Sequence, residues 1–406
     1  MARATMGTRN EIIERHRKEY RKATKKRKGM LLDSICMNTG LSRSRVKHAL
    51  TVAVRSERKQ KKPKTGRKRE YGADTVAALE KIWAYMDFAC GRRLVAGMRD
   101  MLEALERFGE MAFDDAVKQK LNGMSASTAD RLLKHAREKM QLKGRSTTKP
   151  GTLNKRDIPF RLGNEWDDAI PGYVEIDLVA HCGDTTAGDY VNTLDVTDIC
   201  TGWTETQAVL NKAQKHVFNA LMAIQARLPF PFRGIDSDNG SEFINHQLLR
   251  YCKENDICFT RSRPGRKNDN CHVEQKNWHV VRQNIGYGRY EGPRAVAAMN
   301  EYYSRLRLYS NFFLPQTKLI SKTRDGARIK KRYDEPKTPY RRVLESEHIG
   351  DDIKISLTEI YESLNPARLK RDMMLLLKHL ERQQIPLKSA AEQPDGVVGT
   401  VENLPR

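Results

Sequence analysis

Apolar and polar residues alternate along several short stretches in the second half of the chain, which is the pattern of half-buried β-strands. Between these stretches, apolar residues recur at helical spacing. We expect strands at residues 173–181, 189–195, 201–209, 232–237 and 258–263, and helices at 212–227, 241–255 and 270–285. This order, three strands followed by alternating helices and strands, predicts an α/β domain at residues 172–290.

The first 55 residues have helical periodicity on both sides of a turn at Gly40. Leu31 and Ile35 supply an apolar face before the turn, and Ser42 can cap a second helix after it. This is the pattern of a helix-turn-helix domain, whose second helix enters the major groove of DNA. The candidates for base contacts are Arg43, Ser44 and Lys47. A basic helical hairpin without sequence preference is the alternative.

Residues 71–140 are also predicted to be helical and to end in a second helix-turn-helix-like unit around Asn122 and Gly123. Ser125 can cap the helix after this turn. A plain helical connector would show the same caps, so both interpretations stay open. The outward residues that would contact DNA are Thr128, Arg131 and Lys134.

In the remaining segments, apolar residues do not recur at a regular helical or strand spacing. Residues 56–70 form a basic linker, and residues 141–171 form a second linker that contains prolines. Residues 291–350 are basic and predict an extended or small β segment, with short strands at 318–322 and 328–333, in contact with DNA or another protomer. Residues 351–406 predict two amphipathic helices and a disordered tail.

Three acidic residues carry the candidate chemistry. Asp177 lies within the strand at 173–181, and Asp238 ends the apolar run at 232–237 and precedes a turn. Glu274 would lie on the sheet-facing stripe of the helix at 270–285, together with Trp278, Val281 and Ile285. Hard divalent cations take oxygen ligands, and two such ions can activate an attacking oxygen and stabilise a leaving one in phosphoryl transfer. The three residues therefore predict a catalytic site with two Mg²⁺ or Mn²⁺ ions.

The motifs around these acids resemble the D,D-35-E signature of retroviral integrases and related insertion-sequence transposases. Asp238 and Glu274 are separated by 35 residues, and Asn268 and Asp269 match the approach to the glutamate. The resemblance implies a ribonuclease H-like core with a mixed five-stranded sheet, preceded by all-α helix-turn-helix domains. It also implies a metal-dependent polynucleotidyl transferase that cleaves the terminal inverted repeats of its element and joins the 3′-OH to target DNA.

Other polar residues near the triad have weaker assignments. A basic loop before Glu274 would hold DNA phosphates, through Arg261, Arg263, Arg266 and Lys267. Glu175, His272 and His279 could bind a metal or transfer a proton, but a structural role is favoured for each.

The charge distribution agrees with a nucleic-acid partner. The chain of 406 residues has a formal net charge of +23, and residues 1–70 contain 23 Lys/Arg against 6 Asp/Glu. Residues 172–290 contain 13 against 14, so binding and chemistry are expected in different segments. Duplex DNA, at the element ends and at the target, is the expected partner.

The apolar runs and the cysteines indicate where in the cell the protein is expected. No apolar run approaches the length of a membrane span, and the seven cysteines form no Cys-x-x-Cys pair. We expect a cytoplasmic, nucleoid-associated protein that forms a homo-oligomer on DNA. Residues 1–170 contain no counterpart of the retroviral zinc domain. Two alternatives remain: a domesticated transposase that acts as a DNA-binding regulator, and a simple metal-dependent nuclease.

Overall fold

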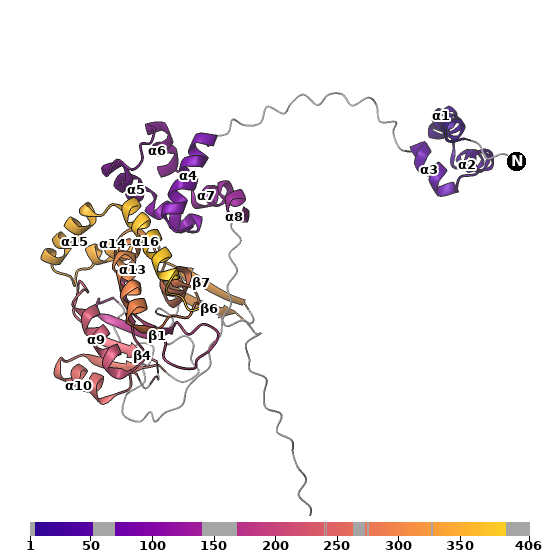
Figure 1. Ribbon diagram of the computed structural model, residues 1–406. Helices are drawn as coiled ribbons and strands as arrows, with labels where there is room; N and C mark the ends of the chain where they lie inside the picture. Colours follow the sequence, from indigo (N-terminus) through magenta and orange to yellow (C-terminus); the bar gives the residue numbers. More distant parts are fainter. Residues whose placement is uncertain are drawn as a thin grey trace, which may run out of the picture. The chain divides into compact units, whose positions relative to one another are not determined.

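The computed structural model describes residues 5–51, 70–139, 169–238, 240, 242–262, 273, 276–325 and 328–386. These residues form two compact units, Met1–Glu70 and Tyr71–Arg406, which we describe separately. Figure 1 shows the elements of each unit.

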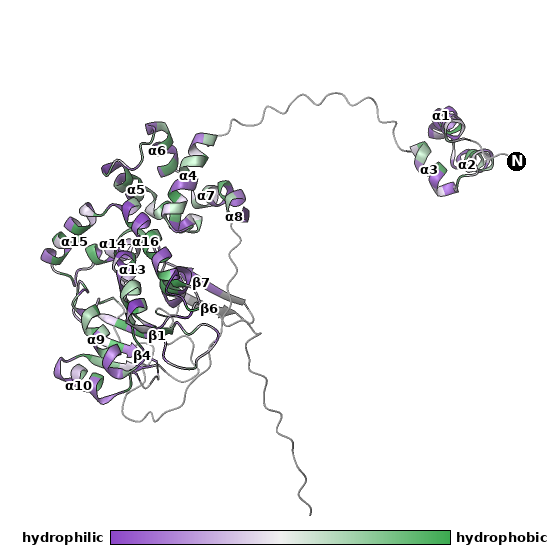
Figure 2. Cartoon of the chain, viewed as in Figure 1, coloured by the Kyte–Doolittle hydropathy of each residue, from purple (hydrophilic) through white to green (hydrophobic). Residues whose placement is uncertain are grey.

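The first unit is a bundle of three helices, α1 (Met6–Lys22), α2 (Lys25–Thr39) and α3 (Arg43–Thr51). Hydrophobic and hydrophilic residues share each helix (Figure 2). The buried residues that join the helices are Ile13, Tyr20, Leu31, Leu32, Ile35, Val46 and Leu50. Gly40 ends α2 in the left-handed region, at a φ of 67°, which glycine adopts without steric cost. The structure therefore has the turn and both helices that the sequence predicts, and adds α1 before them.

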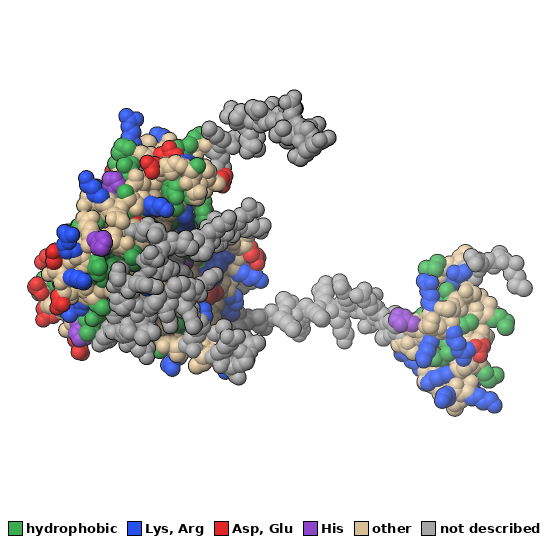
Figure 3. Space-filling view, turned by 90° about the horizontal axis from the view of Figure 1, so that it is seen from below, with side chains coloured by type: hydrophobic (Ala, Val, Ile, Leu, Met, Phe, Trp, Pro, Cys, Tyr) green, Lys and Arg blue, Asp and Glu red, His purple; other side chains and the backbone are tan. Residues whose placement is uncertain are grey.

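Lys and Arg side chains are spread over the visible face of this unit, and few acidic ones lie among them (Figure 3). The exposed basic residues on the three helices include Arg15, Lys18, Arg21, Lys22, Lys25, Lys26, Arg27, Arg43, Arg45 and Lys47. The fold of the unit thus buries its apolar residues and leaves its positive charge in solvent.

The second unit contains a mixed five-stranded sheet with the order β3-β2-β1-β4-β5. Its strands are β1 (Tyr173–Ala180), β2 (Asn192–Asp198), β3 (Thr204–Val209), β4 (Gly234–Ser237) and β5 (Cys258–Arg261). The first three strands form an antiparallel meander, and β4 and β5 continue the sheet in parallel with β1. This confirms the predicted fold class, although β2 begins three residues later than predicted.

The two faces of β1 have different surroundings. Val174 and Ile176 belong to a buried apolar cluster that includes residues of α9 (Gln214–Gln225) and α10 (His246–Glu254). Because side chains alternate along a strand, Glu175 and Asp177 lie on the opposite face. The apolar packing of one face therefore places both carboxylates on the other.

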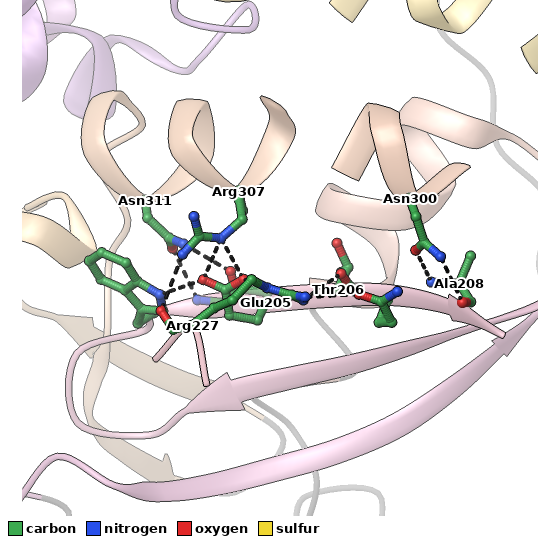
Figure 4. A network of polar contacts seen from close by, with 10 residues as sticks. Glu205, Thr206, Ala208, Arg227, Asn300, Arg307 and Asn311 are labelled. Atoms are coloured by element: carbon green, nitrogen blue, oxygen red, sulfur yellow. Dashed lines mark hydrogen bonds and ion pairs between the residues drawn. The ribbon is translucent and has the colours of Figure 1, made fainter. Parts of the chain in front are cut away.

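The outer edge of the sheet is covered by α13 (Gly292–Phe313) (Figure 4). The amide of Asn311 accepts a hydrogen bond from the Thr204 N–H (3.0 Å) and donates one to the Thr204 carbonyl (2.9 Å). Asn300 makes the same pair of bonds to Ala208, at 2.7 and 3.1 Å. Between them, Arg307 pairs with the buried carboxylate of Glu205. These side chains take the place of a neighbouring strand, so the edge of β3 is not open for pairing.

A layer of helices completes this unit. The helices that precede the sheet are α4 (Ala73–Tyr85), α5 (Gly91–Arg107), α6 (Asp115–Asn122), α7 (Ala126–Leu132) and α8 (Lys134–Lys139). Those that follow α13 are α14 (Pro339–Glu345), α15 (Asp351–Ser363) and α16 (Pro366–Glu381). One apolar cluster contains residues from α4, α5, α13 and α16. The helices of residues 71–139, which the sequence suggests as a separate segment, thus share a core with the C-terminal helices.

The basic segment after α13 contains a two-stranded antiparallel sheet, β6 (Leu319–Asp325) and β7 (Arg328–Tyr333), close to the two strands predicted there. No helix among the described residues is long and apolar enough to span a membrane.

Two helix predictions are wrong in detail. The helix expected to begin at Ser241 begins at His246, because the side chain of Asn245 caps it by accepting the Leu248 N–H (2.9 Å). Trp278, predicted on the sheet-facing stripe after Glu274, is 39% exposed. Residues Asn277–Arg282 form a π-helix, η1, whose i to i+5 hydrogen bonds disrupt the i+4 spacing on which that stripe was based.

Candidate active site

Asp177 and Asp238 occupy matching positions on adjacent strands. In the parallel pairing of β1 and β4, the last pair is Ile176 and Ser237; Asp177 is the next residue of β1, and Asp238 is the first residue after β4. Matching positions on neighbouring strands present their side chains to the same face. The structure therefore brings together two of the three predicted metal ligands.

Backbone contacts orient both carboxylates. Asp177 Oδ1 accepts the Leu178 N–H at 2.8 Å, and Asp238 Oδ1 accepts the Gly240 N–H at 2.8 Å in the turn after β4. That turn is the one predicted from the sequence after Asp238. Each side chain is thus held by the strand end or turn that carries it.

Glu274, the third predicted ligand, lies outside the described residues. The chain on either side of it is tied to β1. Glu175 Oε2 accepts the Val273 N–H at 3.0 Å, and Asp177 Oδ2 accepts a hydrogen bond from the Asn277 amide at 2.6 Å. Glu175 is fully buried and has the structural role favoured by the sequence.

Asn277 is a site residue that sequence reasoning missed. Its Nδ2 contacts Asp177, while its Oδ1 is buried without a hydrogen-bond partner among the described residues. A buried amide oxygen without a partner is costly. Its position three residues after Glu274, on the same side of a helix, was the available signal.

Asp195 and Lys276 are two titratable residues near Asp177 that influence each other electrostatically. Asp195 lies on β2 directly opposite Asp177 and is fully buried. Burial raises the pKa of Asp195, and Lys276 partly offsets this effect. Burial also lowers the pKa of Lys276, whose Nζ donates to the Gly202 carbonyl at 3.1 Å and to Gln316 Oε1. Neither residue was predicted, because nothing local in the sequence marks a cross-strand neighbour.

The residues present suit a hard divalent cation. The donor set on this face of the sheet consists of carboxylate oxygens, which such cations prefer, and the unpartnered Oδ1 of Asn277 adds an acceptor beside it. Within the described residues, no three His, Cys, Asp or Glu side chains form a metal-binding group. Glu274, the predicted third ligand, lies outside these residues.

The predicted DNA-contacting residues fall into three groups. In the first unit, Arg43, Ser44 and Lys47 are exposed on α3, and Arg43 forms an ion pair with Asp33. In the second unit, the structure exposes Arg131 and Lys134, whereas Thr128 is half-buried and its hydroxyl accepts a hydrogen bond from the Ser125 hydroxyl at 3.0 Å. Of the predicted basic loop, Arg263, Arg266 and Lys267 lie outside the described residues. Arg261 is the last residue of β5 and is buried, so its prediction as an exposed loop residue is wrong.

The two histidines are not part of this arrangement as described. His279 is exposed, and its ring nitrogen bonds to Gln283 (3.0 Å) on the same helical stretch. His272 lies outside the described residues.

Comparison with known proteins agrees with the fold of this core. Residues 168–267 match the family described as Integrase core domain. The chain is also 39% identical, over 342 residues, to the protein of Sinorhizobium fredii (strain NBRC 101917 / NGR234) named Uncharacterized protein y4rM. That alignment covers 84% of this chain and 96% of the relative.

Solved structures with lower similarity include three integrases. The catalytic core domain of bovine immunodeficiency virus (BIV) integrase is 18% identical, with a TM-score of 0.28 and coverage of 44% of this chain and 96% of that one. The human T-cell lymphotropic virus (HTLV-2) integrase core in complex with magnesium is 12% identical, with a TM-score of 0.28 and coverage of 37% and 93%. A chain of the simian T-cell lymphotropic virus intasome, complexed with a PP2A regulatory subunit, is 17% identical, with a TM-score of 0.27 and coverage of 45% and 59%.

Two findings place the chain in a family: the relative that aligns over nearly its full length, and the match of residues 168–267 to the integrase core domain. An integrase-family core suggests a role in DNA transposition or integration. The chain belongs to the same family as the Sinorhizobium fredii protein, and its residues 168–267 form an integrase core domain.

Proposed function

We propose that this protein is a DNA transposase that cleaves the ends of its own insertion sequence and joins the resulting 3′-OH to target DNA. The observation that carries the proposal is the pair Asp177 and Asp238, at matching positions on adjacent strands. The ties from β1 to Val273 and Asn277 support a place for Glu274 beside them.

The three acids would together hold two Mg²⁺ or Mn²⁺ ions. Such ions, when bound, supply charge stabilisation for the attacking and leaving oxygens of an in-line displacement. The chain's own residues supply orientation: the Leu178 N–H and the Asn277 amide hold Asp177 in one rotamer, and the Gly240 N–H holds Asp238. Rigid strand ends and a hydrogen-bonded surround keep such a site preorganised.

Binding of the element ends is assigned to residues 1–140. The exposed basic surface of the first unit fits a polyanion, because cations that neutralise phosphates release condensed counterions. On α3, Arg43, Ser44 and Lys47 are the candidates for base contacts, and Arg131 and Lys134 are candidates in the second unit. Because the proposed substrate is DNA, the protein would act at the nucleoid in the cytoplasm. Because an element has two ends, the protein would act as a homo-oligomer that holds both.

The test is a reaction with the DNA that flanks the gene. Purified protein, Mg²⁺ and duplexes carrying those ends should give 3′-end cleavage and joined products. Duplexes of scrambled sequence and reactions with EDTA are the controls. Cleavage without joining would indicate a nuclease, and specific binding without either product would indicate a DNA-binding regulator.

A further inference from the structure

The hairpin of β6 and β7 has no core of its own. It forms a separate two-stranded sheet (Figure 1), and the described side chains along it are exposed on both strands. Among them, Leu319 is 43%, Ile320 58% and Tyr333 38% exposed. An isolated hairpin of two strands is marginally stable in water, so this one gains stability from what holds it or binds it.

The base of the hairpin is anchored firmly. Arg92 donates to the carbonyls of Tyr333 (3.3 Å) and Asp334 (2.8 Å). The Asp334 carboxylate accepts the Lys318 N–H at 2.6 Å and pairs with Arg342 at 2.7 Å. The base of the hairpin is therefore held in place by residues of α5 and α14.

The anchored base lies next to the candidate active site. Gln316, two residues before Lys318, accepts a hydrogen bond from Lys276, which directly precedes the Asp177-binding Asn277. Lys318 Nζ also donates to the Cys200 carbonyl at 2.7 Å, in the connection between β2 and β3. A molecule bound along the hairpin would thus pass close to the proposed metal ligands Asp177 and Asp238.

The charge on the hairpin identifies its partner as a polyanion. Residues 319–333 contain one acidic residue, Asp325, and six basic ones: Lys322, Arg324, Arg328, Lys330, Lys331 and Arg332. Of these basic residues, Lys330, Lys331 and Arg332 have described side chains, and all three are exposed on β7. A row of exposed cations with little acidic charge nearby fits a polyanion.

We propose that the β6–β7 hairpin is an arm that binds duplex DNA through its phosphates, independently of sequence. Duplex DNA has the required charge, and its major groove admits a two-stranded β-ribbon. This inference rests on the proposed function for the identity of the polyanion. The DNA that the hairpin contacts would lie next to the DNA strand that is cleaved or joined.

The experiment measures DNA binding by the full chain in EDTA, so that no reaction occurs. The hairpin variant carries Lys330→Gln, Lys331→Gln and Arg332→Gln, whose side chains are exposed and have no hydrogen bond or ion pair among the described residues. A matched variant removes the same charge at three exposed positions on α16 and just after it, with Arg368→Gln, Lys378→Gln and Arg382→Gln. A third variant exchanges Lys for Arg and Arg for Lys at the three hairpin positions and keeps the charge.

Anisotropy over a salt series should separate these proteins. In a plot of the logarithm of the binding constant against the logarithm of the salt concentration, each lost phosphate contact makes the negative slope shallower by about 0.9. The slope of the hairpin variant should therefore be shallower by about 2–3, and the variant should bind on the order of tenfold more weakly. The loss should be equal for end DNA and scrambled DNA. The charge-preserving variant and the α16 variant should bind like wild type.

Three outcomes would overturn the inference. A hairpin variant with the wild-type slope does not lack a phosphate contact, and a loss confined to end DNA means that the hairpin reads sequence. A changed molecular mass without DNA, at unchanged slope, means that the hairpin binds a second copy of the chain. Because binding is measured without catalysis, failure of wild type to cleave and join would count against the proposed function alone.

Discussion

At the scale of single residues, strand register decides which carboxylates meet. If Asp177, Asp238 and Glu274 are metal ligands, then Asp177→Asn, Asp238→Asn and Glu274→Gln should each abolish cleavage and joining, because an amide replaces a charged oxygen ligand. Binding of end DNA in EDTA should stay near wild type. Gel assays of the products and anisotropy measure the two properties.

Asp184→Asn is the matched control, since Asp184 is an exposed aspartate of the same unit. It should leave joining unchanged. A triad variant that joins DNA at near wild-type rate in Mg²⁺ would remove that residue from the metal site.

Asn277 is expected to act through Asp177. Asn277→Ala removes one of the hydrogen bonds that orient the Asp177 carboxylate, so the Mg²⁺ concentration for half-maximal joining should rise by about 10–100-fold, as for other residues that orient metal ligands. Thermal melting would establish that the fold is retained. An unchanged Mg²⁺ dependence would limit Asn277 to packing.

His181 should make stability depend on pH. It is fully buried, its Nε2 contacts the Thr193 hydroxyl at 2.8 Å, and burial lowers its pKa to about 3. An unfolded chain binds this proton near pH 6.5, so acid favours unfolding. From about pH 7.5 to 5.5, this residue should remove about 1–2 kcal/mol of unfolding free energy.

Urea denaturation at the two pH values tests the role of His181. His181→Gln keeps a polar group near Thr193 but cannot titrate, so its stability should fall less than that of wild type over this interval. An identical fall in both proteins would show that other groups cause the pH dependence.

At the scale of elements, α13 closes the edge of the sheet. Asn311→Ala leaves the N–H and carbonyl of Thr204 without partners in a buried place, and each unsatisfied group costs about 1–3 kcal/mol. We expect a total loss of about 2–4 kcal/mol, measured by urea denaturation. Asn300→Ala should cost less, because Asn300 is only half-buried.

Asn122→Ala, at an exposed position of α6, is the control and should change stability little. Light scattering would show whether the uncovered strand edge in Asn311→Ala promotes association, which is the known hazard of open edges. Equal stability of Asn311→Ala and Asn122→Ala would contradict the edge-closing role.

At the scale of the whole molecule, the cores define what can fold alone. The first unit has its own apolar cluster, whereas residues 71–139 share theirs with α13 and α16. A fragment of residues 1–70 should therefore be helical and bind duplex DNA with a steep salt dependence. A fragment of residues 71–139 should lose helicity, because its apolar residues would be exposed.

Circular dichroism and anisotropy over a salt series measure these properties, with the full chain as reference. Cooperative melting of the 71–139 fragment would show that it is an independent domain. Failure of the 1–70 fragment to bind DNA would assign the electrostatic contact to the second unit.

The sequence by itself determined the features that depend on neighbouring residues. The alternation of apolar and polar residues predicted the strands and put Asp177 within one of them. The spacing of apolar residues on either side of Gly40 predicted the turn between α2 and α3. The resemblance carried by the acidic motifs predicted the core and its sheet. These signals are local, because backbone periodicity and turn chemistry are set within a few residues.

Only the tertiary structure decided which distant residues meet. Asp177 and Asp238 are adjacent because β1 and β4 pair in parallel, and Asp195 faces Asp177 because β2 runs antiparallel to β1. Asn277 contacts Asp177 although the two residues are 100 positions apart in the chain. The shared core of residues 71–139 and the C-terminal helices likewise arises from burial between segments far apart in the chain, and sequence periodicity carries no record of the partner that covers an apolar face.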